Sequence, residues 1–474
     1  MLEKVREYFR HPPKSLVAFF EGRIYPLCVC ILVFWGYALR LEVFSNAIVL
    51  LSLALGLCIS SSIRPLIAPL IVILFQLSPS HSPSSPAFSD YLVRPAVLYP
   101  TLSALALAVG SLVFRLVRIG VRETVRSPIP FLIPSLLLSA AFLTNGAFAS
   151  VYTPRNLVIG LVEVLGFFLV FYLFHFGLSQ ERGEDIVDYF IYVSLLIAML
   201  LSLETLWLYA TGGVVVSGSA VKENLLYGWG IWNNCGQALA VTIPVLFLGA
   251  MRSRIPWVYL LGVAISFFAV MLTLSRSSLL VSLLAVVVCS VIGCFFGKSK
   301  RIFRLSVPLF AIAAFALGLL FWDKISTLLE DFLNRGLSDN GRLSLWQAGI
   351  EGFVKNPVFG KGFFGFESAA ADSVYLYVDF FPRMLHNTVA ELLGAMGIFG
   401  LASYLLYRVS TVRAFVVSPC LAKTMLGVSI LTLLLQSLLD NFVFYVQPMF
   451  YYSIALAIAL KLEGRAGNCE SALS

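Results

Sequence analysis

Long apolar runs separated by short polar or charged segments occupy most of the chain. A helix that spans a bilayer needs about 20 consecutive, mostly apolar residues, and many of these runs approach that length. Charges or turn residues bound fourteen candidate helices, at 24–39, 42–60, 63–79, 96–117, 129–147, 156–179, 187–210, 231–250, 257–274, 277–296, 305–322, 387–408, 424–439 and 442–461. We therefore predict an all-α fold, a polytopic membrane helical bundle of about 12–14 transmembrane helices.

One polar segment, at 323–386, is much longer than the others and has a pattern of its own. Apolar residues recur at helical spacing in two stretches of it: Ile325, Leu328, Leu329, Phe332 and Leu333 in the first, and Leu343, Trp346, Ile350 and Phe353 in the second. Pro357 ends the second pattern. We expect a large extracytoplasmic loop with two amphipathic helices, which lie on the outer leaflet or cap a cavity.

The composition agrees with a membrane protein. Of the 474 residues, 59% are apolar and only 12% are charged, whereas soluble domains carry about 25% charged residues. This excludes an ordinary soluble enzyme, a disordered protein and a disulfide-stapled secreted domain. The eight cysteines fall mostly in apolar runs, without a CxxC and histidine pattern, so we predict neither a disulfide framework nor a zinc site.

The distribution of cations predicts the orientation in the membrane. The chain has 33 Lys and Arg against 25 Asp and Glu, a net charge of +8. If the N-terminus lies inside, most of these cations fall in the loops of the inner side, where Lys and Arg are enriched in membrane proteins. We therefore expect a multi-pass protein of the bacterial cytoplasmic membrane, with both termini cytoplasmic and the 323–386 loop outside. The basic, amphipathic N-terminus does not have the pattern of a cleavable signal peptide.

An arginine among serines, in TLSRSS, marks a junction between two predicted helices at the outer face. Interfacial arginines often extend to lipid phosphates, and Arg276 could do the same. However, Ser275, Ser277 and Ser278 place hydroxyl and backbone donors beside its guanidinium. This combination suits a phosphate or pyrophosphate group.

Two further candidates bound the second half of the long loop. Arg342 begins the second amphipathic helix, where unpaired N–H groups favour an anion, although a lipid headgroup is the alternative. His386 closes the loop directly before a helix, and an imidazole there could act as a base near neutral pH or be purely structural. Asn387 follows it and could cap the helix.

Polar residues also occur within the predicted spans. Asn233, Asn234 and Gln237 lie near the outer end of one helix, either as ligand contacts or as hydrogen bonds between helices. Glu163 and Glu204 are acids within the predicted spans. Each is a functional candidate because of this position, or it pairs with a cation and holds the helices together. No nucleotide-binding, serine-hydrolase or zinc-protease motif occurs, and no close carboxylate cluster suits a divalent metal. We therefore expect no cofactor and no metal.

Four segments, taken in order, resemble the O-antigen ligase/polymerase family of bacterial membrane glycosyltransferases. They are WNNCGQALAVTIP, TLSRSS, GRLSLWQAGIEGFVKNPVFGKGFFGFES and HNTVAELLGAMGIFGL, and the resemblance covers residues 225–410. It implies transfer of a glycan from a polyprenyl (undecaprenyl-type) pyrophosphate donor at the outer face of the cytoplasmic membrane, in cell-envelope polysaccharide biosynthesis.

The resemblance also implies roles for single residues. Arg276 matches the family's Ser-Arg position and Arg342 the arginine that opens the loop helix, while His386 matches the His of a His-Asn pair that activates the acceptor. Family ligases often carry another arginine in the outer loop before the Asn-bearing helix, where Lys222 is the only cation here. The catalytic candidates are thus His386, Arg276 and Arg342, and the substrate-binding candidates are Asn233, Asn234, Gln237, Lys222, Ser275 and Asn387.

These inferences divide the chain into N-terminal transmembrane helices at 1–224, a catalytic region at 225–410, and C-terminal helices with a cytoplasmic tail at 411–474. The expected activity is a metal-independent, inverting transfer of an oligo- or polysaccharide to the hydroxyl of a glycan or glycolipid acceptor, with no nucleic-acid partner. A transporter or flippase for polysaccharides or lipid-linked glycans is the alternative. Ligase and polymerase both stay open, because they share the donor and differ in the acceptor.

Overall fold

A computed structural model describes residues 12–72, 95–119, 129–149, 152–178, 181–305 (without 212–213, 217–218, 221–223 and 228–229), 308, 342–366 and 385–463. Its helices are α2 Lys14–Glu21, α3 Ile24–Ala38, α4 Glu42–Ile59, α5 Ile67–Val72, α7 Pro95–Ile119, α9 Leu132–Leu143, α10 Pro154–Val164, α11 Val170–Gly177, α12 Gly183–Ala210, α13 Trp232–Arg252, α14 Pro256–Leu272, α15 Arg276–Phe295, α18 Arg342–Lys355, α19 Thr388–Val416, α20 Leu421–Asp440 and α21 Val446–Glu463. Short 3-10 turns lie at Arg64–Leu66 (η1) and Phe442–Phe444 (η6), and a π-helical turn at Leu165–Leu169 (η3) joins α10 to α11.

The protein is an all-α, multi-pass membrane bundle, as the sequence predicts. In the described residues, eight helices are long and apolar enough to cross a membrane, and the bent pair α2 and α3 makes a ninth. Three shorter apolar helices, α9, α14 and α21, also match predicted spans. Apart from residues 305 and 308, the predicted span at 305–322 lies outside the described residues, as does the first predicted loop helix, near 325–333. The span at 63–79 is described only to residue 72.

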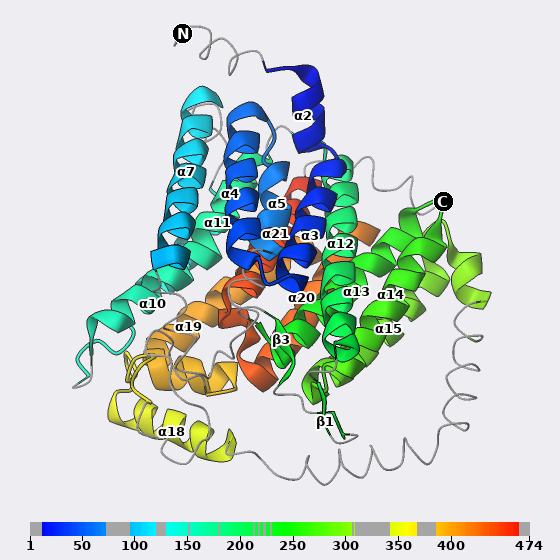
Figure 1. Ribbon diagram of the computed structural model, residues 1–474. Coiled ribbons are helices and arrows are strands. Elements are labelled where there is room, and N and C mark those ends of the chain that lie inside the picture. Colours follow the sequence, from blue (N-terminus) through cyan, green and yellow to red (C-terminus); the bar gives the residue numbers. More distant parts are fainter. Residues whose placement is uncertain are drawn as a thin grey trace, which may run out of the picture.

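Helix α13 forms the centre of the bundle and α7 its edge (Figure 1). Within their most apolar segments, 94% of the residues of α13 are buried but only 11% of those of α7. Helices α12, α14, α15 and α20 pack around α13, whereas α7 packs on α4. Side chains on α13 are therefore fixed by several neighbours at once.

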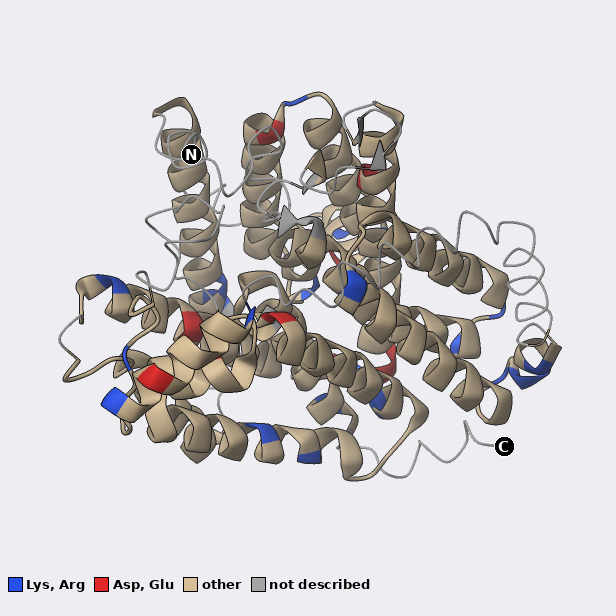
Figure 2. Cartoon of the chain, turned by 90° about the horizontal axis from the view of Figure 1, so that it is seen from below, with Lys and Arg blue, Asp and Glu red and all other residues tan. Residues whose placement is uncertain are grey.

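The two ends of the bundle differ in charge. Two antiparallel hairpins, β1 Val215–Val216 with β2 Ser219–Ala220 and β3 Leu226–Tyr227 with β4 Gly230–Ile231, precede α13 at what we call the hairpin end, the lower end in Figure 1. The opposite, basic end holds the Arg64–Glu181 ion pair (2.5 Å) and Arg252, which binds Glu184 (2.5 Å) and Asp188 (3.0 Å). Figure 2 looks onto the hairpin end and shows that most of the ribbon carries no charged residue.

Helix α19 is broken near the hairpin end, and a turn from the long loop fills the break. Gly397 has φ +65°, and beyond it the N–H groups of Ile398 and Phe399 donate to the carbonyls of Pro357 (2.8 Å) and Val358 (3.2 Å). In an unbroken helix these N–H groups would donate to carbonyls of the preceding turn. Because the helix is broken here, the loop supplies the acceptors instead. The 357–366 turn is therefore part of the bundle.

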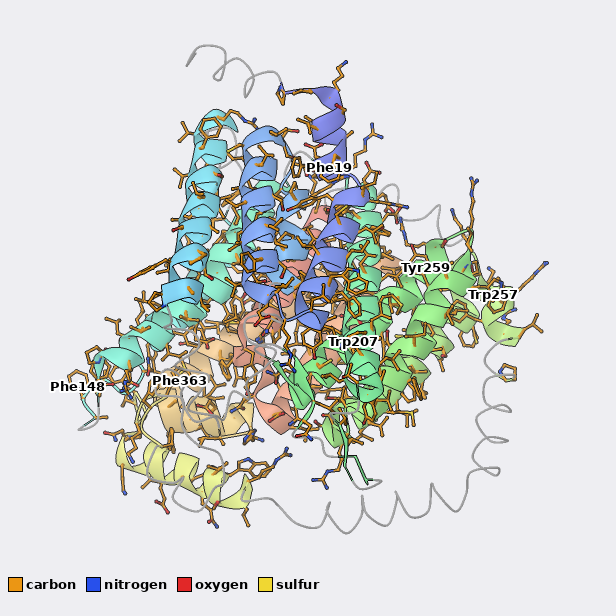
Figure 3. All side chains as sticks on the ribbon, viewed as in Figure 1. Phe19, Phe148, Trp207, Trp257, Tyr259 and Phe363 are labelled. Carbon is orange, nitrogen blue, oxygen red and sulfur yellow. The ribbon has the colours of Figure 1, made fainter. Side chains whose placement is uncertain are left out.

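Two buried asparagines hold the other side of the same turn. Asn145 Oδ1, after α9, accepts the N–H of Phe363, and Asn156 Oδ1 on α10 accepts that of Phe364 (both 3.2 Å). Figure 3 shows Phe363 inside the molecule. Phe148, which lies in the connection between α9 and α10 as Asn145 does, is at the edge of the molecule. The N-terminal helices thus fix a segment of the long loop.

Candidate active site

His386 lies in a sharp turn directly before α19. Its φ is +52°, and Asn387 then takes an extended conformation as the N-cap of α19. The side chain of Asn387 accepts the N–H groups of Val389 (2.9 Å) and Ala390 (3.0 Å), as expected for a capping asparagine. This cap forces the chain to turn before the helix, and the turn leaves the imidazole of His386 38% exposed.

The imidazole is paired with a carboxylate from another helix. His386 Nδ1 forms a short hydrogen bond with Oδ1 of Asp440, the last residue of α20, whose side chain is only 3% exposed. Asn441 follows with φ +52° and ends the helix there. The imidazole is thus in contact with solvent while its partner is buried.

Helix α13 fixes the second oxygen of this carboxylate. Asp440 Oδ2 accepts the side-chain amides of Asn233 (3.2 Å) and Gln237 (3.1 Å), which are one helical turn apart. With His386, three N–H donors converge on Asp440. A carboxylate held in this way has a single orientation, and so does the imidazole bound to it.

The pairing determines which imidazole nitrogen can react. An ionised carboxylate only accepts, so Nδ1 carries the proton and donates it to Asp440. Nε2 then has its lone pair and, with the ring 38% exposed, can accept a proton from a bound hydroxyl. A histidine oriented by a buried aspartate is the arrangement by which serine hydrolases position their base.

The serine-arginine turn lies beside the same turn of α13. Helix α14 ends at Leu272 and α15 begins at Arg276, with Ser275 in an extended conformation between them. Gly236, one residue before Gln237, makes the close approach: a Cβ there would lie 2.7 Å from Thr273 Oγ1 and 3.0 Å from Ser278 Oγ. The predicted junction between two helices at Arg276 is confirmed.

This turn has the features of an anion site. The first N–H groups of α15 have no partner within the helix and present its positive dipole end, and Arg276 stands in that first turn. Buried Ser275 and Ser278 bond to each other through their hydroxyls (2.8 Å). Arg276 itself is half-buried.

Helix α18 lies across the start of α19 (Figure 1). It begins at Arg342, as predicted, and ends at Lys355 before Pro357. Gly349 and Gly352 form its buried face: a Cβ at Gly349 would lie 2.8 Å from Leu385 Cδ1, next to His386. Because a helix rises about 1.5 Å per residue, Arg342 is on the order of 10 Å along α18 from this contact.

The remaining surface of α18 is amphipathic, which confirms the second predicted loop helix. Leu343, Ile350 and Val354 are exposed on one face. The exposed side chains of Gln347 and Glu351 occupy the adjacent face. Such a helix suits a position parallel to a bilayer surface.

The structure brings together most of the predicted site residues, but with different partners from those expected. Asn233 and Gln237 bind Asp440, and Asn387 uses its amide to cap α19 and to donate to the Leu438 carbonyl (3.0 Å). Asn234 is buried, and no donor reaches its Oδ1 among the described residues. Lys222 lies outside the described residues.

Asp440 is the residue that the sequence analysis missed. It lies in LLLQSLLDNF, between two apolar runs that are each predicted to span the membrane. The sequence therefore indicates only a short connection at this position. The available signal is an isolated acid at the end of an apolar helix, which is a functional candidate by default. Among the described residues, no group of three or more His, Cys, Asp or Glu could hold a metal ion.

Comparison with known proteins gives one match. Residues 261–405 match the model of a family described as O-antigen ligase. This confirms the predicted resemblance, and the matched segment contains Arg276, Arg342 and His386. No curated protein matches the chain. The boundaries drawn at residues 224 and 410 stay predictions.

Proposed function

We propose that this membrane protein, a member of the O-antigen ligase/polymerase family, transfers an oligo- or polysaccharide from a polyprenyl pyrophosphate donor to an acceptor hydroxyl. The family suggests glycan transfer in O-antigen biosynthesis. The observation that carries the finer proposal is the oriented imidazole of His386, held by Asp440 at the end of the bundle where α15 and α18 present Arg276 and Arg342.

The proposed reaction is a single displacement. The acceptor oxygen attacks the anomeric carbon of the donor sugar while His386 Nε2 takes the hydroxyl proton. The bond from this carbon to the phosphate oxygen breaks, and polyprenyl pyrophosphate leaves with the electron pair. One displacement inverts the anomeric centre.

The two arginines would stabilise the negative charge that grows on the leaving phosphate. A guanidinium offers a planar pair of donors that matches phosphate oxygens, and the N-terminus of α15 adds backbone N–H groups. By analogy with oxyanion sites, each well-placed donor contributes roughly 3–4 kcal/mol to the transition state. No step requires a metal, because Arg276 and Arg342 supply the positive charge.

We further propose that the hairpin end faces outward from the cytoplasmic membrane. The helices that meet at the site carry cations toward their other ends: Arg252 on α13, Arg413 on α19, Lys423 on α20, and Lys298 after α15. The positive-inside rule favours the cytoplasm for such an end. A carrier lipid flipped to the outer leaflet would then meet the site.

A purified system tests the reaction. The protein in lipid nanodiscs, given a lipid-linked oligosaccharide and an acceptor, should form a new glycosidic bond, and His386→Ala should lower the rate roughly 10²–10⁴-fold at equal protein abundance. Turnover should survive EDTA. Movement of the donor between leaflets without a new bond would instead show a transporter, and full activity of His386→Ala would remove the base.

The product separates the two branches of the proposal. A capped glycolipid acceptor identifies a ligase, whereas a lengthened lipid-linked chain identifies a polymerase. Both products require the same donor and the same His386 base, so this result refines the acceptor and leaves the mechanism unchanged.

A further inference from the structure

Glu391 lies beneath the His386–Asp440 pair and contacts the chain on both sides of it. The residue is fully buried in the first turn of α19. Its Oε2 accepts the backbone N–H of Leu385 (2.7 Å) and the side-chain amide of Asn441 (2.8 Å). One donor directly precedes His386 and the other directly follows Asp440.

Both connected turns have an unfavourable backbone conformation. His386 and Asn441 each have φ +52°, in the left-handed region of the backbone. Residues other than glycine adopt this conformation at a free-energy cost, and it persists only where surrounding contacts hold it. The two hydrogen bonds to Glu391 hold Leu385, the residue before His386, and the side chain of Asn441 itself. They therefore stabilise the turn that presents the imidazole and the turn that presents the carboxylate.

Other hydrogen bonds between α19 and α20 do not connect the residues that flank His386 and Asp440. Thr388 donates to the carbonyl of Ser437 (2.6 Å) and Asn387 to that of Leu438 (3.0 Å). Both join the helix ends, but neither touches Leu385 or Asn441. Among the described residues, Glu391 is the side chain that bonds to both flanks of the pair.

We propose that Glu391 is a positioning residue that fixes His386 and Asp440 relative to each other. The effect of this positioning on catalysis rests on the proposed function. Both donors bind the same oxygen, and no donor reaches Oε1 among the described residues. The role therefore needs an acceptor of this shape, which a glutamine amide oxygen also provides, and does not need the negative charge.

The first measurement compares Glu391→Gln with Glu391→Leu in the nanodisc transfer assay. Glu391→Gln should keep kcat within about threefold of the parent, because one acceptor can serve both donors. Glu391→Leu should lower kcat roughly 10²-fold with little change in KM, since the reacting groups are misplaced while substrate contacts stay. Glu42→Leu, at a buried carboxylate on α4, is the matched control and should behave as the parent.

The second measurement does not depend on catalysis. Diethyl pyrocarbonate modifies exposed imidazoles, and mass spectrometry of the peptide that contains His386 gives its rate in the full chain. Glu391→Leu should raise this rate roughly tenfold, because the turn opens more often without its acceptor. Asn441→Gly removes one donor but suits a left-handed backbone, and should change the rate in the same direction even if Glu391→Leu folds poorly.

The outcomes separate this role from the function itself. If the parent transfers no glycan but Glu391→Leu and Asn441→Gly still expose His386, the positioning role stands and the glycan-transfer proposal fails. Parent-like kinetics and parent-like His386 reactivity in both variants would overturn the positioning role. A Glu391→Gln variant as impaired as Glu391→Leu would also overturn it, because the charge would then matter instead of the geometry.

Discussion

Three donors determine the chemistry of a single imidazole. The carboxylate of Asp440 accepts hydrogen bonds from Asn233, Gln237 and His386, so it cannot rotate without breaking one of them. The proton of His386 therefore stays on Nδ1. Asn233 and Gln237, which are predicted substrate-binding candidates, thus hold the carboxylate that orients His386.

Replacing Asp440 by Asn should lower the transfer rate roughly 10²–10⁴-fold, because an amide can donate to Nδ1 and so favour the wrong tautomer. Steady-state kinetics in nanodiscs measure this, with substrate affinity expected to change little. Asp188→Asn, at the basic end beside Arg252, is the matched control and should keep the parent rate. Equal rates for both variants would contradict the role of the carboxylate.

Arg276 tests whether the serine-arginine turn binds phosphate. Arg276→Lys should lose nearly as much activity as Arg276→Ala, roughly 10²–10³-fold, since an ammonium cannot make the paired hydrogen bonds of a guanidinium. The measurement is kcat/KM for the lipid-linked donor. A lysine variant close to the parent would instead indicate contact with lipid headgroups.

At this scale the sequence predicts the candidate residues of the site better than the partners of these residues. His386 stands out because it is the histidine at the junction of a patterned loop and a helix, and Arg276 because serines surround it. Asp440 is 54 positions from His386, and neither spacing nor periodicity relates the two. Only the packing of α19 against α20 brings them together.

At the scale of elements, the 357–366 turn connects the long loop to the bundle. It supplies acceptors to the broken part of α19, and its backbone donates to Asn145 and Asn156. Helix α18, which begins at Arg342, is thereby held against the segment that presents His386. The loop near the site is thus positioned by helices from both halves of the chain.

A substitution in this turn should disturb both stability and activity. Gly362 has φ +85°, and a Cβ there would lie 2.6 Å from Asn156 Nδ2, so Gly362→Ala adds strain of about 1–3 kcal/mol. We expect a lower thermal unfolding midpoint in detergent and a lower transfer rate. Gly110→Ala on α7, where a Cβ meets nothing within 4 Å, should leave both unchanged.

The sequence predicts α18 well, because apolar spacing and Pro357 determine its pattern and its end. It does not predict how α18 docks, since Gly349 and Gly352 read as interruptions of an amphipathic helix and become the contact face only when α19 is present. The break at Gly397 is hidden for the same reason: GAMGIFGL continues an apolar run without a proline.

At the scale of the whole molecule, the ion pairs between arginines and acids lie at the end of the bundle opposite the site. Arg64 and Arg252 pair with acids at the basic end, and His386 and Arg276 lie at the other end of the bundle. Hydropathy and charge counts predicted the helices and this polarity, because both depend on composition over long segments and not on particular contacts.

Labelling with a membrane-impermeant maleimide in intact cells tests the orientation. Thr211→Cys, exposed at the hairpin end, should label from outside above the background of the native cysteines. Arg254→Cys, exposed at the basic end, should label only after the membrane is permeabilised. The reverse pattern would place His386 in the cytoplasm, away from a flipped carrier lipid.

The carboxylate partner of His386 has a consequence for protein engineering. The family match ends at residue 405, while Asp440 and the amides on α13 lie beyond its two borders. A graft of residues 261–405 from a relative would import an imidazole and leave its support to the host. The segment that contains His386, Asp440 and both amides therefore runs from the start of α13 to Asn441, and chimeras cut inside it should be assembled but inert.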